Sequence, residues 1–545
     1  MKKIILACLG IFYLASCTDQ LRIDQKQIAE DVTYNTSAKY LLSGSIDGIA
    51  QFYQAAGFQN DRYCTIVQYY QQLFSTKAQV YDDFTNSTDS WDTELLLIKP
   101  VEAGIIKAQE EKDTYVEGAL LVLKSFMFAH LTDTYGDIPY SEALQGREGI
   151  FFPKYDAQKD VYDGLLADLD QAIKLFEAGA ELKEHNFDLI YAGDNSKWVK
   201  FANSLKVRLL VRSYEAFKKI GVDNGAKLSA IVSGGKYFQS VSDNASYNYL
   251  GTASYNSWPL GKVFRDASGT DLSRRKPSST FVNTLKSLGD PRITGWLAPA
   301  LVPWANSETT TVITDRYGYT YNVHSQDIAD DVNNEAQDGV FPDYPVGDTY
   351  VGMSVGHIST NPTRYGGTDN PFPKAGAFNN FRVSSFSDLF RQDASDLMPM
   401  SLLQACEVNL CLAEAAQKGW ISGSAKTFYD KGITLNMERW LIPQEEISTY
   451  LANPSVSLNG TGNIEKIATQ KWLALFTNGV EGYFDYRRTG LPSSIYAAVP
   501  SSIADKFPLR WRYPAPELSN NAKQVAEATS RQGGDTQFTK MWLLK

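Results

Sequence analysis

The hydrophobic positions of residues 115–135 predict a buried helix near the middle of the fold. Apolar side chains recur there at the three- and four-residue spacing of a helix, and the opposite face is apolar as well. A helix that is apolar nearly all round is buried against other elements. Lys124 and His130 interrupt the run before it reaches the roughly 20 residues that a membrane-spanning helix needs. Gly136 and Pro139 then end the helix.

Further helical patterns predict a mainly α-helical fold. They cover residues 158–176, 197–217, 399–419, 426–440 and 463–476, and weaker ones begin near residue 39. Consecutive helices joined by a loop pack as antiparallel hairpins. A strict 34-residue repeat is not visible, so the pattern alone supports an array of helical hairpins and nothing more specific.

Residues 235–385 interrupt the helical pattern. They are rich in Pro and Gly, which disfavour long helices. Residues 309–313 and 317–324 alternate in the manner of strands around Asp315 and Arg316, which predicts a small β-hairpin. We expect a single domain over residues 39–545, in which a helical scaffold of residues 39–234 and 386–545 carries residues 235–385 as a loop-rich excursion.

The N-terminus has the pattern of a signal peptide. Lys2 and Lys3 precede a short apolar run, and Leu14-Ala15-Ser16-Cys17 has the small residues of a cleavage site. This stretch resembles the lipobox of bacterial lipoproteins, which implies that residues 1–16 are removed and that Cys17 is lipidated. Residues 17–38 are polar and suit a tether. An ordinary secretory signal with an incidental cysteine is the alternative.

Composition and charge narrow the class of protein. The chain is 43% hydrophobic and 12% aromatic, which indicates a protein that buries a large core. Its net charge of −10 argues against nucleic acid as a partner, because such binders need clustered Lys and Arg. Cys64, Cys406 and Cys411 give neither a disulfide framework nor a zinc-type spacing. We expect no metal and no cofactor.

Four stretches together resemble the SusD/RagB family of outer-membrane nutrient-binding lipoproteins. The stretches are Tyr135-Gly136-Asp137-Ile138-Pro139-Tyr140, residues 403–416 with their alanine-glutamate-alanine ending, residues 464–491 with Gly482-Tyr483-Phe484-Asp485-Tyr486-Arg487-Arg488, and residues 512–521 with Tyr513-Pro514. The resemblance covers the chain from end to end, with the loosest match in residues 235–385.

The resemblance implies a tetratricopeptide-like scaffold whose variable, loop-rich face holds the ligand. It also implies a lipid-anchored protein of the outer membrane, facing the cell exterior in Bacteroidota, that captures nutrients for a SusC-like TonB-dependent transporter. The ligand implied is most often a glycan, with peptide capture in the RagB manner as an alternative. A surface adhesin and a hydrolase are further alternatives. The shared motif residues, Arg487 and Arg488 among them, are expected to fix the scaffold.

A glycan site needs flat aromatic rings for C–H faces and polar side chains for hydroxyl groups. Two stretches offer that mixture, and two tryptophans are weaker candidates. The candidate residues are Tyr81, Asp83, Asn86 and Trp91 in a predicted loop, Tyr317, Tyr319 and Tyr321 on one face of a predicted strand, and Trp258 and Trp296. The alternative is that these rings pack in the core or across strands. We expect Trp91→Ala to weaken ligand binding with little change in the melting temperature.

The enzyme hypothesis rests on one literal motif. Residues 352–356 read Gly-Met-Ser-Val-Gly and His357 follows, but a nucleophile elbow requires a helix after the serine, and Pro362 comes too soon for one. No zinc-protease, phosphate-loop or dinucleotide motif is present. The sequence therefore favours a binding protein over an enzyme.

Overall fold

The structure is a computed structural model that describes residues 36–59, 61–72, 88–330, 346–355, 381–497 and 507–545. The predicted signal peptide, Cys17 and most of the predicted tether lie outside these residues, as do Tyr81, Asp83 and Asn86. The division of the chain into signal peptide, tether and one folded domain stays a prediction.

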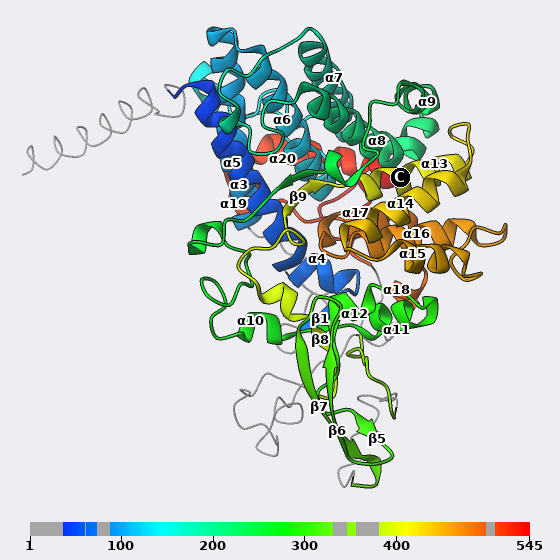
Figure 1. The fold of residues 1–545 in the computed structure, drawn as a ribbon. Helices are drawn as coiled ribbons and strands as arrows, with labels where there is room; N and C mark the ends of the chain where they lie inside the picture. Colours follow the sequence, from blue (N-terminus) through cyan, green and yellow to red (C-terminus); the bar gives the residue numbers. More distant parts are fainter. Residues whose placement is uncertain (1–35, 60, 73–87, 331–345, 356–380, 498–506) are drawn as a thin grey trace, which may run out of the picture.

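Helices dominate the described residues, and the early ones pack side by side in chain order (Figure 1). They are α3 (Ala38–Gln54), α5 (Thr88–Glu111), α6 (Thr114–Tyr135), α7 (Gln158–Glu177) and α8 (Asn195–Lys219). Contacts then pass from α8 to the later helices α13 (Ala405–Gln417), α14 (Ala425–Arg439) and α16 (Asn463–Ala474). The prediction of a mainly α-helical, tetratricopeptide-like scaffold of hairpins is confirmed.

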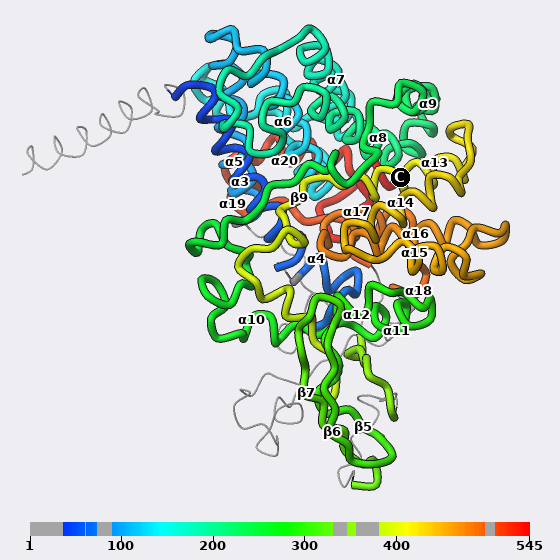
Figure 2. The backbone as a smooth tube through the Cα atoms, viewed as in Figure 1, coloured from blue at the N-terminus to red at the C-terminus, as the bar shows by residue number. Residues whose placement is uncertain are grey.

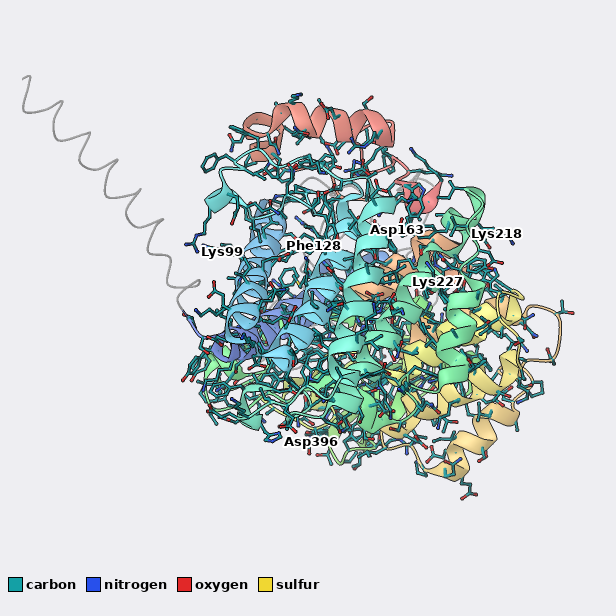
Figure 3. All side chains as sticks on the ribbon, turned by 90° about the horizontal axis from the view of Figure 1, so that it is seen from above. Lys99, Phe128, Asp163, Lys218, Lys227 and Asp396 are labelled. Carbon is teal, nitrogen blue, oxygen red and sulfur yellow. The ribbon has the colours of Figure 1, made fainter. Side chains whose placement is uncertain are left out.

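The predicted central helix is α6. Asp113 caps its start by accepting a hydrogen bond from the Val116 amide at 3.0 Å. Nearly all of its side chains are buried between α5 and α7. Viewed from above, Phe128 of α6 lies among the helices, whereas Asp163 of α7 and Lys218 of α8 lie on the outside (Figure 3). None of the helices in the described ranges has the length and apolar character to cross a membrane.

The C-terminal segment returns to the turn that follows α6 (Figure 2). Gly136 takes a φ of +88° there, and a side chain at this position would collide with Gln532. The Tyr513 hydroxyl donates to the Asp137 carbonyl at 2.6 Å, and Arg531 Nε donates to the Asp137 carboxylate at 2.8 Å. Two of the stretches that carried the family resemblance therefore meet in space.

Several further helices complete the described chain. They are the π-helix η1 (Ala55–Gln59), α4 (Asp61–Ile66), α9 (Gly225–Gly234), α15 (Gln444–Ala452), α17 (Gly479–Thr489), α18 (Ser494–Ala497), α19 (Ala515–Asn520) and α20 (Ala522–Gln532). The α-helices in the described part of residues 235–385 are short: α10 (Thr270–Ser273), α11 (Ser279–Leu288) and α12 (Ile293–Trp296). The expectation that long helices avoid this segment holds for its described part.

Small strand pairs hold the excursion together and fasten it to the scaffold. The pairs are β1 (Tyr70–Gln72) with β3 (Arg275–Pro277), β2 (Ala245–Tyr247) with β9 (Met400–Leu403), and β4 (Leu297–Ala298) with β8 (Ser385–Phe386). The helix predicted from Pro399 onward is wrong in its first part, because residues 400–403 form β9 before α13 begins. An apolar run of that length fits either element, and pairing with β2 decides for the strand.

The predicted β-hairpin is present in the excursion. It consists of β6 (Thr309–Thr314) and β7 (Thr320–Asp327), and β5 (Trp304–Ala305) pairs with the other edge of β7 to give the order β5-β7-β6. The hairpin projects from the helical body at the lower end of the molecule (Figure 1). The prediction of minor β-structure within a loop-rich segment is confirmed.

Candidate functional site

Trp91, the first-ranked ring of the predicted loop, lies in the core. It belongs to the first turn of α5, its side chain is 1% exposed, and its ring centroid lies 4.8 Å from that of Tyr135. The prediction of a loop at this residue is wrong. Ser, Thr, Asn and Asp before Trp91 were interpreted as loop residues, but the same residue types also begin helices.

Trp258 and Trp296 are also buried. The Trp258 indole donates to the Phe390 carbonyl at 3.0 Å, and the Trp296 ring lies 4.8 Å from that of Phe476 between ring centroids. The structure therefore contradicts an exposed binding role for either ring. Both fill the interior where the excursion meets the scaffold, which is the use that large rings most often have.

Only one of the three hairpin tyrosines is open to a ligand. Tyr321 is buried in β7 and its hydroxyl donates to Asp315 Oδ2 at 3.1 Å, while the Tyr317 hydroxyl donates to the Trp440 carbonyl at 3.1 Å. The prediction that the three rings share one face of a strand is wrong, because Tyr317 and Tyr319 lie in the turn before β7. Tyr319 is half-buried, and its hydroxyl makes no hydrogen bond within the described residues.

The charge of the Asp388 carboxylate acts on Tyr319, and this carboxylate has no hydrogen-bond partner among the described residues. Asp388 begins the 3-10 helix η9 (Asp388–Arg391), and its backbone amide donates to the Tyr321 hydroxyl at 2.9 Å. Its half-buried carboxylate accepts no hydrogen bond from any described residue. Burial raises the pKa of Asp388, and the charges of Arg391 and Lys262 oppose that rise. A half-buried acceptor without a partner is suited to bind a ligand hydroxyl group.

Exposed rings lie on the neighbouring loop of residues 250–264. Tyr255 is 69% exposed and Phe264 is 41% exposed, with Leu250 and Val263 also exposed. Exposed apolar side chains gathered in one loop are characteristic of binding surfaces.

This loop is fixed by the segment that follows η9. Asp393 accepts hydrogen bonds from the amides of Val263 and Phe264 at 3.1–3.3 Å, and its carbonyl accepts one from the Trp258 amide at 2.7 Å. The Lys262 amide donates to the Arg391 carbonyl at 2.9 Å. The rings are therefore held on ordered backbone, which lowers the entropic cost of binding.

We call this region the Asp388 surface. It comprises Tyr255, Lys262, Phe264, Tyr319, Asp388 and Arg391. Asp396, which follows Arg391 by five positions in the chain, lies at the molecular surface (Figure 3). It combines exposed apolar rings with the Asp388 carboxylate and with two basic side chains whose charges act on that carboxylate, a mixture that can bind a polyhydroxylated ligand.

Sequence reasoning found only Tyr319 of this surface. The ring and polar residues of Tyr255-Asn256-Ser257-Trp258 alternate in the same way as those of the stretch that was chosen, residues 81–91. That signal was available and was missed. Among the described residues, no group of three His, Cys, Asp or Glu side chains lies in a position to bind a metal ion. Ser354 lies in a described segment of the enzyme motif, while His357 lies outside the described residues.

The chain matches a protein-family model over most of its length. The model is that of SusD-like proteins, described as starch-binding and associating with the outer membrane, and it matches residues 29–514. No curated protein matches the chain.

Solved structures share the fold. A SusD homologue from Bacteroides fragilis has 23% identity and a TM-score of 0.71, covering 94% of this chain and 100% of that one. A SusD homologue from Bacteroides uniformis has 21% identity and a TM-score of 0.68, covering 93% and 99%. A chitin-binding SusD homologue from Flavobacterium johnsoniae has 19% identity and a TM-score of 0.66, covering 92% and 98%. At such identities the likeness concerns the fold alone.

Proposed function

The chain belongs to the SusD-like family, and from this premise we propose that it captures an oligosaccharide on the Asp388 surface without altering it. The captured ligand then passes to a SusC-like TonB-dependent transporter in the outer membrane. The family association with the outer membrane supports the location, and the predicted lipidation of Cys17 supplies the anchor on the outer face.

The unpartnered carboxylate of Asp388 carries the proposal. Sugar hydroxyl groups donate well to a carboxylate, and the half-buried position strengthens such a bond relative to one in water. Lys262 and Arg391 offer donors for ring and hydroxyl oxygens next to it. Phe264 and Tyr255 add exposed rings against which the C–H face of a sugar can pack.

Calorimetric titration of the full chain with soluble oligosaccharides of chitin, of starch and of other polysaccharides tests this proposal. We expect Asp388→Asn to weaken the affinity by roughly tenfold or more, because a charge-assisted hydrogen bond is lost. Phe264→Ala should weaken it by a smaller factor. Phe151→Ala is the matched control, since this phenylalanine is 73% exposed on the scaffold before α7 and should leave the affinity unchanged.

Three outcomes would overturn the proposal. They are equal affinities for all three variants, turnover of the bound oligosaccharide, and binding of peptides with no binding of any sugar. The last outcome would favour peptide capture.

Membrane attachment is tested separately. We expect Cys17→Ala to release the protein from the membrane fraction into the soluble fraction, because the lipid on this cysteine is the proposed anchor. Retention of the variant in cells that lack a transporter partner would contradict the proposed lipidation.

A further inference from the structure

Strand β6 is an unprotected edge of the projecting β-hairpin. Among the described residues it pairs only with β7, on one side, in an unbroken register from Thr309↔Ser325 to Thr314↔Thr320. Its sequence is Thr-Thr-Thr-Val-Ile-Thr, and Val312 is 65% exposed. Natural proteins protect such edges with Lys, Pro or a bulge, and β6 has none of them. An edge of this kind is a template for another strand.

The hydrogen bonds between β7 and β5 show which backbone groups of β6 point away from the sheet. The amides of His324 and Gln326 in β7 donate toward β5, to the carbonyls of Leu301 and Pro303 at 2.8 and 3.0 Å. Backbone groups alternate in direction along a strand, so the odd-numbered residues of β7 bond to β6. In β6 the amides and carbonyls that point away from β7 therefore belong to Thr310, Val312 and Thr314. Within the described residues these outward groups have no hydrogen-bond partner.

We propose that β6 pairs antiparallel with β6 of a second copy of this chain, about a two-fold axis that passes by Val312. Val312 then lies opposite Val312, and Thr310 opposite Thr314, so the outward groups of one strand meet the outward groups of the other. The same register places Glu308 opposite Arg316, but Arg316 already donates to Glu446 at 2.6 Å, so the pairing depends on the backbone groups of the two strands. The two hairpins become one continuous sheet.

A second copy suits this edge because the strand is complementary to itself. It carries no charge, so no like charges oppose each other within the pair, and every side chain is β-branched and suited to cross-strand packing. The net charge of −10 on each chain opposes association of the bodies. The hairpin projects from the body, however, and such repulsion is screened beyond a Debye length of about 8 Å at physiological ionic strength (Figure 1).

Disulfide trapping tests the register. In the proposed pair the two copies of residue 312 have Cα atoms about 5.5 Å apart, which a disulfide can bridge. Residue 309 of one copy lies opposite residue 315 of the other, so the two copies of residue 309 are six positions, or about 20 Å, apart. Every variant carries Cys8→Ala and Cys17→Ala, and the remaining three cysteines are buried.

We expect Val312→Cys to form a cross-linked dimer under mild oxidation many times faster than Thr309→Cys, which is also exposed to solvent. Equal rates for the two variants, or no cross-linking of either, would overturn the proposal.

Sedimentation equilibrium of the chain without an engineered cysteine measures dimerisation independently of cross-linking. The wild-type chain should show a dimer whose fraction rises with concentration, and Val312→Lys should remove it by placing two charges face to face. Val222→Lys, at an exposed valine after α8, is the control and should dimerise as the wild type does. A wild-type chain that stays monomeric at all concentrations would refute the pairing, as would unchanged dimerisation of Val312→Lys. Neither a monomeric wild type nor unchanged dimerisation of Val312→Lys would affect the proposal of oligosaccharide binding.

Discussion

At the scale of single residues, Trp91 contributes to the core and not to a binding loop. Its ring lies against Tyr135 and parallel to the ring of Tyr155, and its indole N–H has no hydrogen-bond partner within the described residues. Most of its contribution is therefore packing.

We expect Trp91→Ala to lower the free energy of unfolding by about 3–5 kcal/mol, because a large ring leaves a cavity in the core. Trp91→Phe should cost much less, since it keeps an aromatic ring and removes an unsatisfied N–H. Urea denaturation of both variants measures the difference. An alanine variant as stable as the wild type would contradict the buried position and restore the original loop hypothesis.

His130 and Glu94 form a buried pair between α6 and α5, with His130 Nδ1 2.8 Å from Glu94 Oε2. Burial alone would lower the pKa of His130, but the Glu94 carboxylate raises it, and the net shift is upward from 6.5. A raised pKa in the folded state means that protonated His130 stabilises the fold. That contribution is complete below about pH 6.5 and is lost as the pH rises through the folded-state pKa.

We expect the difference in unfolding free energy between wild type and His130→Gln to shrink from about pH 6.5 upward and to level off above the folded-state pKa. Chemical denaturation at a series of pH values gives this difference directly. A difference that stays constant or grows with pH would show that the histidine is neutral in the folded protein.

The Asp388 surface could not be predicted from the sequence because it combines residues from three distant segments. Lys262, Tyr319 and Asp388 come from a loop, a turn and a short helix, and no window of the sequence contains two of them. Tyr319 was found by alternation, although that alternation also selected Tyr321, which is buried. Spacing along a chain identifies rings, but their exposure depends on tertiary packing.

At the scale of elements, buried charges connect α8 with α13 and α17. Arg208 donates to both oxygens of Glu407, at 2.6 and 2.8 Å, and lies 3.3 Å from Glu481. Arg488 donates to Glu414 at 2.7 Å and to Asp485 at 2.6 Å. All of these groups except Glu414 line a small cavity between the helices. Arg488 therefore stabilises the scaffold, as expected for a motif residue of the family.

We expect Arg208→Met to cost about 3–5 kcal/mol of stability, because it leaves Glu407 buried without its partner. Adding Glu407→Leu should recover much of that loss, since an apolar pair replaces the ionic one. Lys159→Met is the control for charge removal, because its pair with Asp163 on α7 is exposed and should contribute little. A double variant no better than Arg208→Met would mean that Glu481 or the cavity, and not Glu407, determines the cost.

The long helices were predictable because their apolar periodicity extends over several turns. α6, α7 and α8 begin and end within a few residues of the predicted ranges. The whole of α5 was missed, because its first residues are typical of turns and Pro100 interrupts its pattern, and α15 was missed because it is short and polar. β9 was mistaken for helix because its partner, β2, lies more than 150 residues earlier.

At the scale of the whole molecule, the end of the chain completes the middle of the fold. The Tyr513 hydroxyl donates to the Asp137 carbonyl and accepts from Gln532 Nε2 at 2.6 Å, and Arg510 donates to the Tyr135 carbonyl at 2.8 Å. These contacts join α6 to the segment that precedes α20 (Figure 2).

We expect Tyr513→Phe to lower the unfolding free energy by about 1–3 kcal/mol, because two buried polar groups lose their partner. Tyr40→Phe, at an exposed ring of α3, should have no effect. Thermal or chemical denaturation of both variants provides the comparison. If Tyr513→Phe matched the wild type, the hydroxyl would contribute nothing to the closure of the scaffold.

The return of the C-terminal segment to α6 also has a consequence for synthesis on the ribosome. The Tyr135 carbonyl and the Arg510 side chain that binds it are 375 positions apart in the chain. At roughly 5–20 residues per second, the residues of α6 are translated about 20–75 s before this partner exists. For that interval the nascent polypeptide has no complete core, and a chain that must be exported benefits from remaining unfolded until translation ends.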